Sequence, residues 1–440
     1  MSLSKRRVAV IGGTSGPPEH MTHSQFDIVV VGAGQAGGEL VVAARQGGFE
    51  GTILLIGAEP FLPYQRPPLS KAYLLGELSK EALLLKAPAL FEKLRVEVRL
   101  QARVNQIDRV GRTLRLSNGE TVRYGKLAVC TGGRVRRLNV EGSTSGQEHP
   151  NLHYLRSIAD ADRLHQALVP GNRFVLIGGG YVGLEVAAVA RQRGIDVTVI
   201  EAMPRVLARV TSPEVSAFYE RVHRDAGVVI RTNTPVNGLE VSADRRVTAV
   251  VCGDGTREPC DALIVGIGLI PNTELAQQAG LAVDNGIVVD ECARTRDPDI
   301  WAAGDCTNFP SVHYGRRMRL ESVPNAIEQA RVAAAGMAGK VKTYDSVPWF
   351  WSDQYDLKLQ TVGLSEGYDQ VVIRGSMQKR SFAAFFLREH RVIAVDSVNR
   401  PAEFVFAKRL VTERVPVTAE RLSDENTPLK DCLKSLAATA

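Results

Sequence analysis

Two segments of the chain share one order of apolar, glycine-rich and helix-like stretches. In the first, the apolar residues 27–31 lead into the loop Gly32-x-Gly34-x-x-Gly37, and a helical pattern then precedes a second apolar run at 52–56. A short apolar run bounded by turn residues is typical of a buried parallel strand. The order therefore predicts a strand–helix–strand unit with a glycine-rich turn after its first strand.

The same order returns further along the chain. The mostly apolar stretch 173–177 leads into Gly178-x-Gly180-x-x-Gly183, which is followed by a helical pattern and a second strand-like stretch at 196–200. The repetition predicts a second strand–helix–strand unit, inserted into the first domain.

The pattern after this insertion predicts a return to the first domain. An apolar run at 299–303 precedes Gly304 and Asp305, and a helical pattern covers residues 325–338. Beyond residue 339 the chain changes to strand-like stretches, at 358–362, 370–373, 382–387 and 392–395. We therefore predict an α/β fold with two Rossmann-like dinucleotide-binding domains in a glutathione reductase-like architecture, followed by a C-terminal α+β domain.

These changes of pattern set the expected domain boundaries. A further glycine-rich stretch near Gly12 is followed by Pro17 and Pro18, where a phosphate-binding helix would have to begin, so it predicts no nucleotide site. The four predicted parts are a disordered extension at 1–25, a first nucleotide-binding domain at 26–133 and 264–338, a second at 134–263, and the C-terminal domain at 339–440.

The composition is typical of a globular protein of about three domains. The 440 residues are 44% hydrophobic and 23% charged. No run of about 18 uncharged apolar residues is present, and the stretch at 6–13 is too short for a signal peptide, so we expect a cytoplasmic protein without a membrane segment. The net charge of +6 is modest and the basic runs are short, which argues against a nucleic-acid partner.

Six cysteines are scattered along the chain without any Cys-x-x-Cys pair. This spacing argues against a zinc site, a disulfide framework and an iron–sulfur cluster bound by the chain itself, so we expect no metal. Flavoprotein disulfide reductases need a redox cysteine pair, and related oxidases and peroxidases use one cysteine. The segment 57–71 contains none, which disfavours both classes.

The three glycines of each loop have distinct tasks. The first allows the tight turn, the second lets the backbone approach a pyrophosphate, and the third lets the helix pack closely on the strand. The phosphate then lies at the helix N-terminus, where N–H groups and the helix dipole favour an anion. Two such loops predict two bound dinucleotides, one tightly held and one exchanging, although spacing leaves open which is which.

An acidic residue follows the second strand of each unit, Glu59 in the first and Glu201 in the second. A carboxylate at this place accepts hydrogen bonds from a ribose diol and repels a 2′-phosphate. The second site is therefore predicted to prefer NADH to NADPH, with Arg205 as a nearby residue that would favour a phosphate.

Five short motifs give the chain a resemblance to a known family. They are PYQRPPLSK at 63–71, GGGYVGLE at 178–185, GIGLIPN at 266–272, WAAGD at 301–305 and WFWSDQY at 349–355. Together they resemble the putidaredoxin reductase-like NADH-dependent ferredoxin reductases, which serve bacterial cytochrome P-450 systems and ring-hydroxylating dioxygenases. The resemblance runs from about residue 26 to the C-terminus.

The resemblance implies that the first domain binds FAD and the second binds NADH. Asp305 would hold the ribityl chain, and the helix start at Val323 would point N–H groups at the pyrimidine edge of the flavin. The residues implicated for FAD are Gly32, Gly34, Gly37, Glu59, Arg66, Lys71, Thr131, Gly132, Asp305 and Val323. Those implicated for NADH are Gly178, Gly180, Tyr181, Val182, Gly183, Glu185, Glu201 and Gly268.

The same resemblance makes Lys71 and Glu185 the catalytic pair. Lys71 would lie beside flavin N5, where a cation stabilises the anionic reduced flavin, and Glu185 would pair with it. From the residues alone, Lys71 is equally a surface lysine, and Glu185 is equally a helix-start acid stabilised by the dipole. The implied reaction is hydride transfer from NADH to FAD N5, followed by single-electron transfer to a separate, acidic two-iron, two-sulfur ferredoxin.

Two features are candidates for docking that ferredoxin. Basic runs at 134–137 and 316–319 would attract an acidic partner, although such runs are more often solvated surface. The tryptophans of the 349–355 motif border the flavin and the docking face in relatives, although core packing is the alternative. The candidate docking residues are Arg316, Arg317, Arg319, Trp349 and Trp351.

Two other classes share this plan and stay open as alternatives. A monodehydroascorbate reductase-like enzyme also needs no cysteine and reduces a small radical, whereas the segment 349–355 favours the ferredoxin reductases. An apoptosis-inducing-factor-like protein uses the same fold for redox signalling, but the basic runs here are small. The sequence identifies neither the oligomeric state nor the ferredoxin and oxygenase served.

Overall fold

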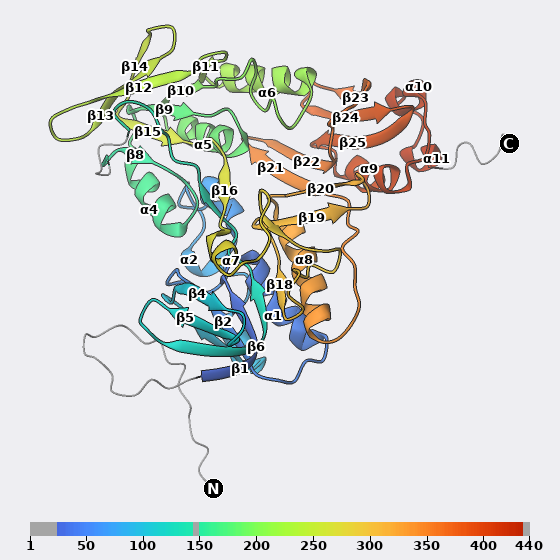
Figure 1. The fold of residues 1–440 in the computed structure, drawn as a ribbon. Coiled ribbons are helices and arrows are strands. Elements are labelled where there is room, and N and C mark those ends of the chain that lie inside the picture. Colours follow the sequence, from blue (N-terminus) through green and yellow to red (C-terminus); the bar gives the residue numbers. More distant parts are fainter. Residues whose placement is uncertain (1–23, 144–148, 434–440) are drawn as a thin grey trace. The chain divides into compact units, whose positions relative to one another are not determined.

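The computed structural model describes residues 24–143 and 149–433, which form two compact units (Figure 1). Of the described residues, the first unit contains 24–64 together with Leu84–Gly133 and Pro271–Ser346. The second contains Gln65–Leu83 and the described residues of 134–270 and 347–433. The predicted fold class is confirmed, with parallel Rossmann-like sheets and a C-terminal α+β part.

The chain enters the first unit earlier than expected. Strand β1 begins at Ser24, so Ser24 and Gln25, which were assigned to the extension, belong to a strand that pairs with β6. The rest of the predicted extension, residues 1–23, lies outside the described residues.

A mostly parallel seven-stranded sheet forms the centre of the first unit. Its strand order is β3-β2-β1-β6-β5-β4, and β18 pairs with the last residues of β6. Both faces of β1 are buried, which explains its uninterrupted apolar run. The strands are β1 (Ser24–Val31), β2 (Ile53–Ile56), β3 (Val96–Arg99), β4 (Val104–Asp108), β5 (Thr113–Leu116), β6 (Thr121–Val129) and β18 (Ile300–Ala302).

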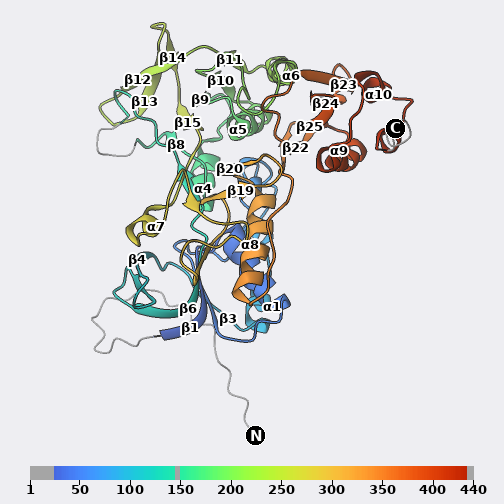
Figure 2. The ribbon, with the colours of Figure 1, turned by 45° about the vertical axis from the view of Figure 1, so that its right-hand side comes forward.

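Two helices of the first unit, α1 (Gln35–Gln46) and α8 (Val323–Met337), pack side by side next to this sheet (Figure 2). Helix α1 follows the first glycine-rich loop, whereas α8 belongs to the later segment Pro271–Ser346. Their contact therefore joins the early and late segments of the first unit. The remaining elements are α3 (Pro88–Lys93), α7 (Glu274–Gln278), and the small sheet of β17 (Ile287–Val288), β19 (Thr307–Ser311) and β20 (Arg316–Met318).

The second unit is built on a parallel five-stranded sheet in the order β11-β10-β9-β15-β8. Its strands are β8 (Leu152–His153), β9 (Arg173–Ile177), β10 (Asp196–Ile200), β11 (Val229–Arg231) and β15 (Ala262–Val265). The helices are η1 (Pro67–Ser70), α2 (Lys80–Leu83), α4 (Ile158–Ala167), α5 (Tyr181–Gln192) and α6 (Pro213–Asp225). A separate antiparallel sheet contains β12 (Val236–Val241), β13 (Val247–Cys252) and β14 (Arg257–Pro259). Two short strands, β7 (Gly133–Val135) and β16 (Leu269–Pro271), pair with each other.

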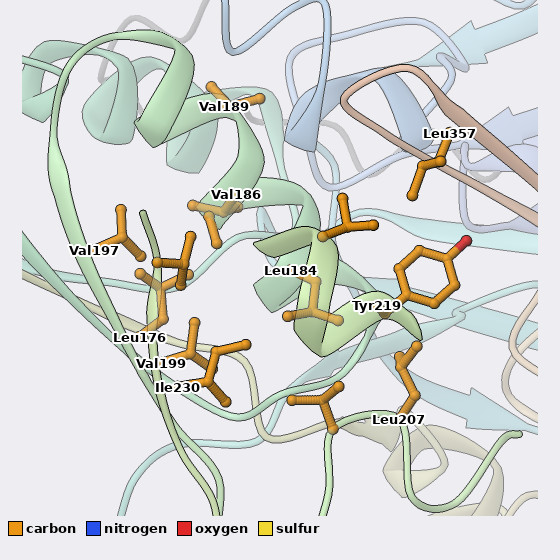
Figure 3. Close-up of a cluster of buried hydrophobic side chains, with 14 of the residues drawn as sticks. Leu176, Leu184, Val186, Val189, Val197, Val199, Leu207, Tyr219, Ile230 and Leu357 are labelled. Atoms are coloured by element: carbon orange, nitrogen blue, oxygen red, sulfur yellow. The ribbon is translucent and has the colours of Figure 1, made fainter. Parts of the chain in front are cut away.

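The core of the second unit joins strands to the helix after the second glycine-rich loop. Figure 3 shows Leu176 and Val199 of the sheet together with Leu184 and Val186 of α5, and all four are buried. The apolar pattern that predicted this strand–helix–strand unit therefore produces its core.

The C-terminal residues form an antiparallel sheet in the order β21-β22-β25-β24-β23. Alternate residues of β24 face different cores: Phe382 and Phe386 pack with the α5 and α6 core, whereas Phe385 packs with Leu410 of α9. This alternation explains why the C-terminal part belongs to the second compact unit. The elements are β21 (Trp349–Gln354), β22 (Leu357–Gly363), β23 (Gln370–Ser376), β24 (Ser381–Arg388), β25 (Arg391–Val398), α9 (Pro401–Glu413), α10 (Ala419–Ser423) and α11 (Leu429–Cys432).

Candidate active site

The first glycine-rich loop connects β1 to α1. The Gly32 N–H donates to Ile56 O at 2.8 Å, and the φ angle of Gly32 is +114°. A Cβ atom on Gly32 would lie 2.1 Å from Cys130 O, and one on Gly37 would lie 1.9 Å from Gly32 O, so both positions require glycine. A Cβ atom on Gly34 would meet nothing within 4 Å, which shows that this position faces open space.

The second loop, between β9 and α5, repeats this geometry. The Gly178 N–H donates to Ile200 O at 2.8 Å, and φ of Gly178 is +107°. A Cβ atom would lie 2.4 Å from Gly266 O on Gly178 and 2.3 Å from Gly178 O on Gly183, whereas one on Gly180 would meet nothing within 4 Å. The two loops therefore use each of their three glycines in the same way.

The helices after both loops begin without a side-chain cap. Gly34 precedes α1 and Gly180 precedes α5, and neither has a side chain that could accept a hydrogen bond from the first N–H groups of its helix. By contrast, the serines Ser157, Ser212 and Ser322 cap α4, α6 and α8. Uncapped N–H groups beside an open glycine position suit an anion, so both loops fit the pyrophosphate of a dinucleotide.

The two acids after the second strands have different partners. Glu59 accepts a hydrogen bond from the Tyr64 hydroxyl at 2.6 Å. Glu201 accepts from the N–H of Gly179 at 2.7 Å and from the N–H of Met203 at 2.8 Å. The Glu201 carboxylate is therefore held against the second loop itself, where it fits the predicted contact with a ribose diol.

Arg205 is bonded to the second unit's own oxygens. Its guanidinium donates to Ser216 Oγ at 2.5 Å, to Ala208 O at 3.0 Å and to Ser212 O at 3.3 Å. Since these bonds occupy both terminal nitrogens, the residue that would have favoured a 2′-phosphate is engaged elsewhere.

Lys71 and Glu185 form an ion pair inside the second unit. Lys71 follows η1, and its Nζ lies 2.8 Å from Glu185 Oε2. The Glu185 side chain is only 4% exposed, and its carboxylate also accepts from Ser70 Oγ and Ser352 Oγ, each at 2.5 Å. A buried carboxylate is costly unless it is paired and hydrogen-bonded, and these three donors supply both.

The predicted FAD residues divide between the two compact units. Arg66 and Lys71 belong to the second unit, in the segment Gln65–Leu83 that the sequence boundaries had assigned to the first domain, and the other predicted FAD residues belong to the first unit. Arg66 Nη1 donates to Arg156 O at 2.6 Å. The segment lies in the second unit because η1 contacts α4 and α5.

Comparison with known proteins decides the family. The family model described as pyridine nucleotide-disulphide oxidoreductase matches residues 26–330. The chain belongs to this oxidoreductase family. A second family model, described as reductase C-terminal, matches residues 349–433 of this oxidoreductase.

The relatives of this oxidoreductase are similar over nearly their whole length. Putidaredoxin reductase of Pseudomonas putida is 49% identical, with 94% of this chain and 98% of the relative covered. Rhodocoxin reductase of Rhodococcus erythropolis is 43% identical, with 92% and 94% covered. The solved covalent complex of putidaredoxin reductase with putidaredoxin contains a chain that matches with a TM-score of 0.91 at 48% identity, covering 94% of this chain and all of that one.

FAD and NAD(H) are the cofactors of this oxidoreductase. The two helix starts without a side-chain cap are compatible with two bound nucleotides.

Two further predicted FAD residues lie at the end of β6. Thr131 Oγ1 donates to Asn272 O at 2.7 Å, and Asn272 Nδ2 donates to Thr131 O at 2.9 Å. Gly132 follows with φ of +59°. These reciprocal bonds fix the turn that approaches the first loop through Cys130.

The other two predicted FAD residues follow β18 and begin α8. Asp305 comes after Gly304, whose N–H donates to the buried Gln329 Oε1 at 2.8 Å. Val323 is the first residue of α8, which Ser322 caps through the Asn325 N–H. Both residues belong to the first unit.

The remaining predicted NADH residues surround the start of α5 or lie on a turn. Tyr181 packs against Phe350 of β21, with ring centroids 4.7 Å apart, and Val182 is exposed. Gly268 has φ of +103°, and a Cβ atom there would meet nothing within 4 Å. The open Gly268 position thus resembles Gly180.

The basic candidates for docking are partly engaged within the first unit. Arg317 donates to Val289 O and Asn308 O, both at 2.6 Å, and Arg319 pairs with Glu321 at 2.6 Å. Arg316 is exposed on β20. Neutralisation by Glu321 weakens the attraction that Arg319 would exert on an acidic partner.

The two tryptophans lie on one face of β21. Their ring centroids are 5.6 Å apart, and Trp349 also packs against Phe404 of α9 at 5.8 Å, with Lys408 Nζ 5.7 Å from its ring. Both rings are half-buried. Trp349 and Trp351 therefore combine aromatic packing with partial exposure.

The six cysteines are all free, although the family name includes a disulphide. Among the described residues, no group of His, Cys, Asp or Glu side chains is arranged to hold a metal ion. Likewise, no helix in the described ranges is long and apolar enough to cross a membrane.

Two serines that bind Glu185 were not predicted from the sequence. Ser70 lies directly before Lys71, and Ser352 lies inside the quoted 349–355 motif. The period of two along β21 could have placed Ser352 on the face opposite Trp349 and Trp351. No sequence signal connects either serine to Glu185, because that contact depends on packing.

Proposed function

We propose that this oxidoreductase is an NADH-dependent ferredoxin reductase that passes electrons to a two-iron, two-sulfur ferredoxin, which in turn feeds a cytochrome P-450 or a ring-hydroxylating dioxygenase. The observation that carries the proposal is the full-length similarity to putidaredoxin reductase, solved as a covalent complex with putidaredoxin. The two loops and the buried ion pair support it.

The second loop would bind NADH. The uncapped start of α5 would hold the pyrophosphate, and Glu201, fixed by Gly179 and Met203, would accept hydrogen bonds from the adenosine ribose. A 2′-phosphate would meet this carboxylate, while Arg205 is held by Ser216. We therefore propose a preference for NADH.

The first loop would bind FAD, with Glu59 accepting from its ribose, and Asp305 and Val323 at the flavin end. FAD held there would supply the redox chemistry that converts the two-electron hydride of NADH into single electrons. Lys71 would supply the positive charge that favours the reduced form, and Glu185 would hold the Lys71 ammonium in place. Neither residue acts as a nucleophile.

The partner and the compartment follow from the same proposal. An acidic ferredoxin would be attracted by the exposed Arg316 and would approach the edges of Trp349 and Trp351, with an association rate that falls as salt rises. We place the reaction in the cytoplasm, because unpaired cysteines suit a reducing compartment.

The test is cytochrome c reduction by NADH, measured with and without a separate two-iron, two-sulfur ferredoxin. The proposal expects the ferredoxin to raise the rate at least about tenfold, and the purified reductase to show a flavin spectrum without iron–sulfur absorption. An unchanged rate with ferredoxin, together with rapid reduction of monodehydroascorbate radical, would assign the small-acceptor function instead.

A further inference from the structure

A buried chain of hydrogen bonds leads away from Glu185 through the second unit. Ser352 Oγ lies 2.5 Å from Glu185 Oε1, and Gln354 Nε2 lies 3.2 Å from Ser352 Oγ. Gln354 Oε1 is 2.8 Å from His223 Nε2, and His223 Nδ1 is 3.2 Å from the Tyr355 hydroxyl. Three side chains from β21 and α6 thus connect the ion pair to Tyr355, in the turn after β21.

The first three members of this chain are almost fully enclosed. Ser352 and Gln354 are each 1% exposed, and His223 is 0% exposed. Ser352 and Gln354 share one face of β21 because alternate residues of a strand point the same way. At this depth water cannot replace a lost partner, so each proton must have a defined place.

Only one arrangement of protons satisfies every contact of an ionised Glu185. The carboxylate can only accept, so Ser352 must donate its single proton to Glu185. The Ser352 oxygen must then accept from the Gln354 amide N–H, which directs the Gln354 carbonyl oxygen toward His223. That carbonyl can only accept, so His223 must carry its proton on Nε2.

The far end of the chain is consistent with this direction. Burial lowers the pKa of His223 to about 4, so the ring is neutral at pH 7 and Nδ1 is a bare acceptor. Burial raises the pKa of Tyr355 to about 12, so its hydroxyl keeps the proton that it donates to Nδ1. Every donor from Tyr355 to Ser352 therefore points toward Glu185.

We propose that Ser352 is a positioning residue for the Lys71–Glu185 pair, and that Gln354, His223 and Tyr355 fix the direction of its hydroxyl. Ser352 holds Glu185 Oε1 from one side while Ser70 and Lys71 bind Oε2. The carboxylate therefore cannot rotate away from the Lys71 ammonium. This series of hydrogen bonds does not conduct protons to the site. A proton accepted at the Gln354 carbonyl oxygen is not passed on through the amide nitrogen.

This inference rests on the proposed function, since it assigns Ser352 to the ion pair proposed to assist flavin reduction. Its consequence is specific: loss of Ser352 should slow flavin reduction without weakening NADH binding, which depends on the second loop. Ser397 offers a matched control, because its buried hydroxyl has no hydrogen-bond partner among the described residues.

The first experiment is nitrogen-15 NMR of the flavin-loaded protein with labelled histidine, using His223→Gln to assign the signal. The proposal expects His223 at pH 7 to be neutral, with a protonated Nε2 and a bare Nδ1. A proton on Nδ1, or a doubly protonated ring, would overturn the proposed direction of the chain. This readout does not depend on turnover.

The second experiment is anaerobic stopped-flow reduction of the bound flavin by NADH. Ser352→Ala should lower the limiting rate roughly tenfold, because a hydrogen bond to a charged group is lost, and should leave the NADH dissociation constant within about twofold. Ser352→Thr should restore most of the rate, and Ser397→Ala should match the wild type. Equal rates in Ser352→Ala and Ser397→Ala would overturn the positioning role.

The two proposals fail in different ways. If NADH does not reduce the wild-type flavin, or ferredoxin does not stimulate cytochrome c reduction, the proposed function fails whatever the His223 tautomer is. If wild-type reduction is normal and Ser352→Ala is equally fast, only the role of Ser352 fails. If Ser352→Ala does not fold, Ser352→Thr and the wild-type NMR still decide.

Discussion

The two glycine-rich loops have nearly the same backbone and different surroundings. In each, the first glycine donates a 2.8 Å hydrogen bond to the end of the second strand, the third excludes any side chain, and the second faces open space. Each helix also carries a glutamate two residues after the third glycine, Glu39 in the first loop and Glu185 in the second.

These two equivalent glutamates have different partners. Glu39 pairs with Arg331 of α8 at 2.8 Å, and the Arg331 side chain is 47% exposed. Glu185 is buried with Lys71 and two serines. A half-exposed pair contributes about 0–1 kcal/mol, whereas a buried charge is stable only with its full set of partners. In the function proposed above, the loop geometry would serve nucleotide binding in both units, and the packing behind the helix start would distinguish the chemistry of the second.

The largest expected effect comes from exchanging these glutamates for glutamine. Glu185→Gln should slow flavin reduction by NADH roughly 100-fold, because the Lys71 ammonium loses its anionic partner in a buried place. Glu39→Gln should change the rate less than about twofold, since its partner is partly solvated. Stopped-flow absorbance measures both, and equal effects of the two changes would contradict the distinction drawn between the loops.

Replacing the acids that follow the second strands, Glu201 and Glu59, should have a smaller effect, and each change should affect only one of the two nucleotides. Glu201→Ala should reduce the preference for NADH over NADPH roughly tenfold, because the carboxylate that repels a 2′-phosphate is removed. Glu59→Ala should instead weaken flavin retention and leave the preference unchanged. Steady-state assays with ferricyanide as the acceptor measure kcat/KM for both nucleotides. A wild-type kcat/KM with NADPH equal to that with NADH would contradict the predicted role of Glu201.

The smallest expected effect is on thermal stability, and it comes from Asp396, a buried acid of the second unit. Burial raises the pKa of Asp396 to about 7 from 3.8, against a hydrogen bond from Thr211 that lowers it. The unfolded chain ionises above about pH 4 while the folded chain keeps the proton until about pH 7, so stability falls as pH rises through this window. Above pH 7 the cost is fully present.

Asp396→Asn cannot ionise and should therefore raise Tm by a few degrees at pH 8, with a smaller gain at pH 5, because 1 kcal/mol corresponds to roughly 2–4 °C in a domain of this size. Differential scanning calorimetry at the two pH values measures the difference. A gain that is the same at both pH values would show that Asp396 does not titrate as described.

Much of the fold was accessible from the sequence because its strands are buried on both faces. The runs before Gly32 and Gly178 are continuously apolar, and the glycines after them admit only one kind of turn. The placement of Gln65–Leu83 in the second unit was not accessible, since it depends on how η1 packs against α4 and α5.

The residues of the candidate site also divide into those that the sequence predicted and those that only the structure identifies. Lys71 and Glu185 were predicted as a pair from the resemblance of their motifs to a family, and in the structure Lys71 Nζ lies 2.8 Å from Glu185 Oε2. Ser352 and His223 carry no local signal, because a serine in a strand and a histidine in an amphipathic helix are ordinary residues until tertiary packing brings them to Glu185. Sequence patterns describe local backbone needs, whereas such hydrogen-bond chains arise from contacts distant in the sequence.

The assignment of one nucleotide to each loop is tested most directly by the flavin content and NADH affinity of Gly34→Ala and Gly180→Ala. Both variants should fold with nearly unchanged Tm, because neither new methyl group meets an atom within 4 Å. Gly34→Ala should lose most of its flavin, whereas Gly180→Ala should keep the flavin and need at least about tenfold more NADH for half-maximal reduction. Loss of flavin from Gly180→Ala with retention in Gly34→Ala would contradict the assignment.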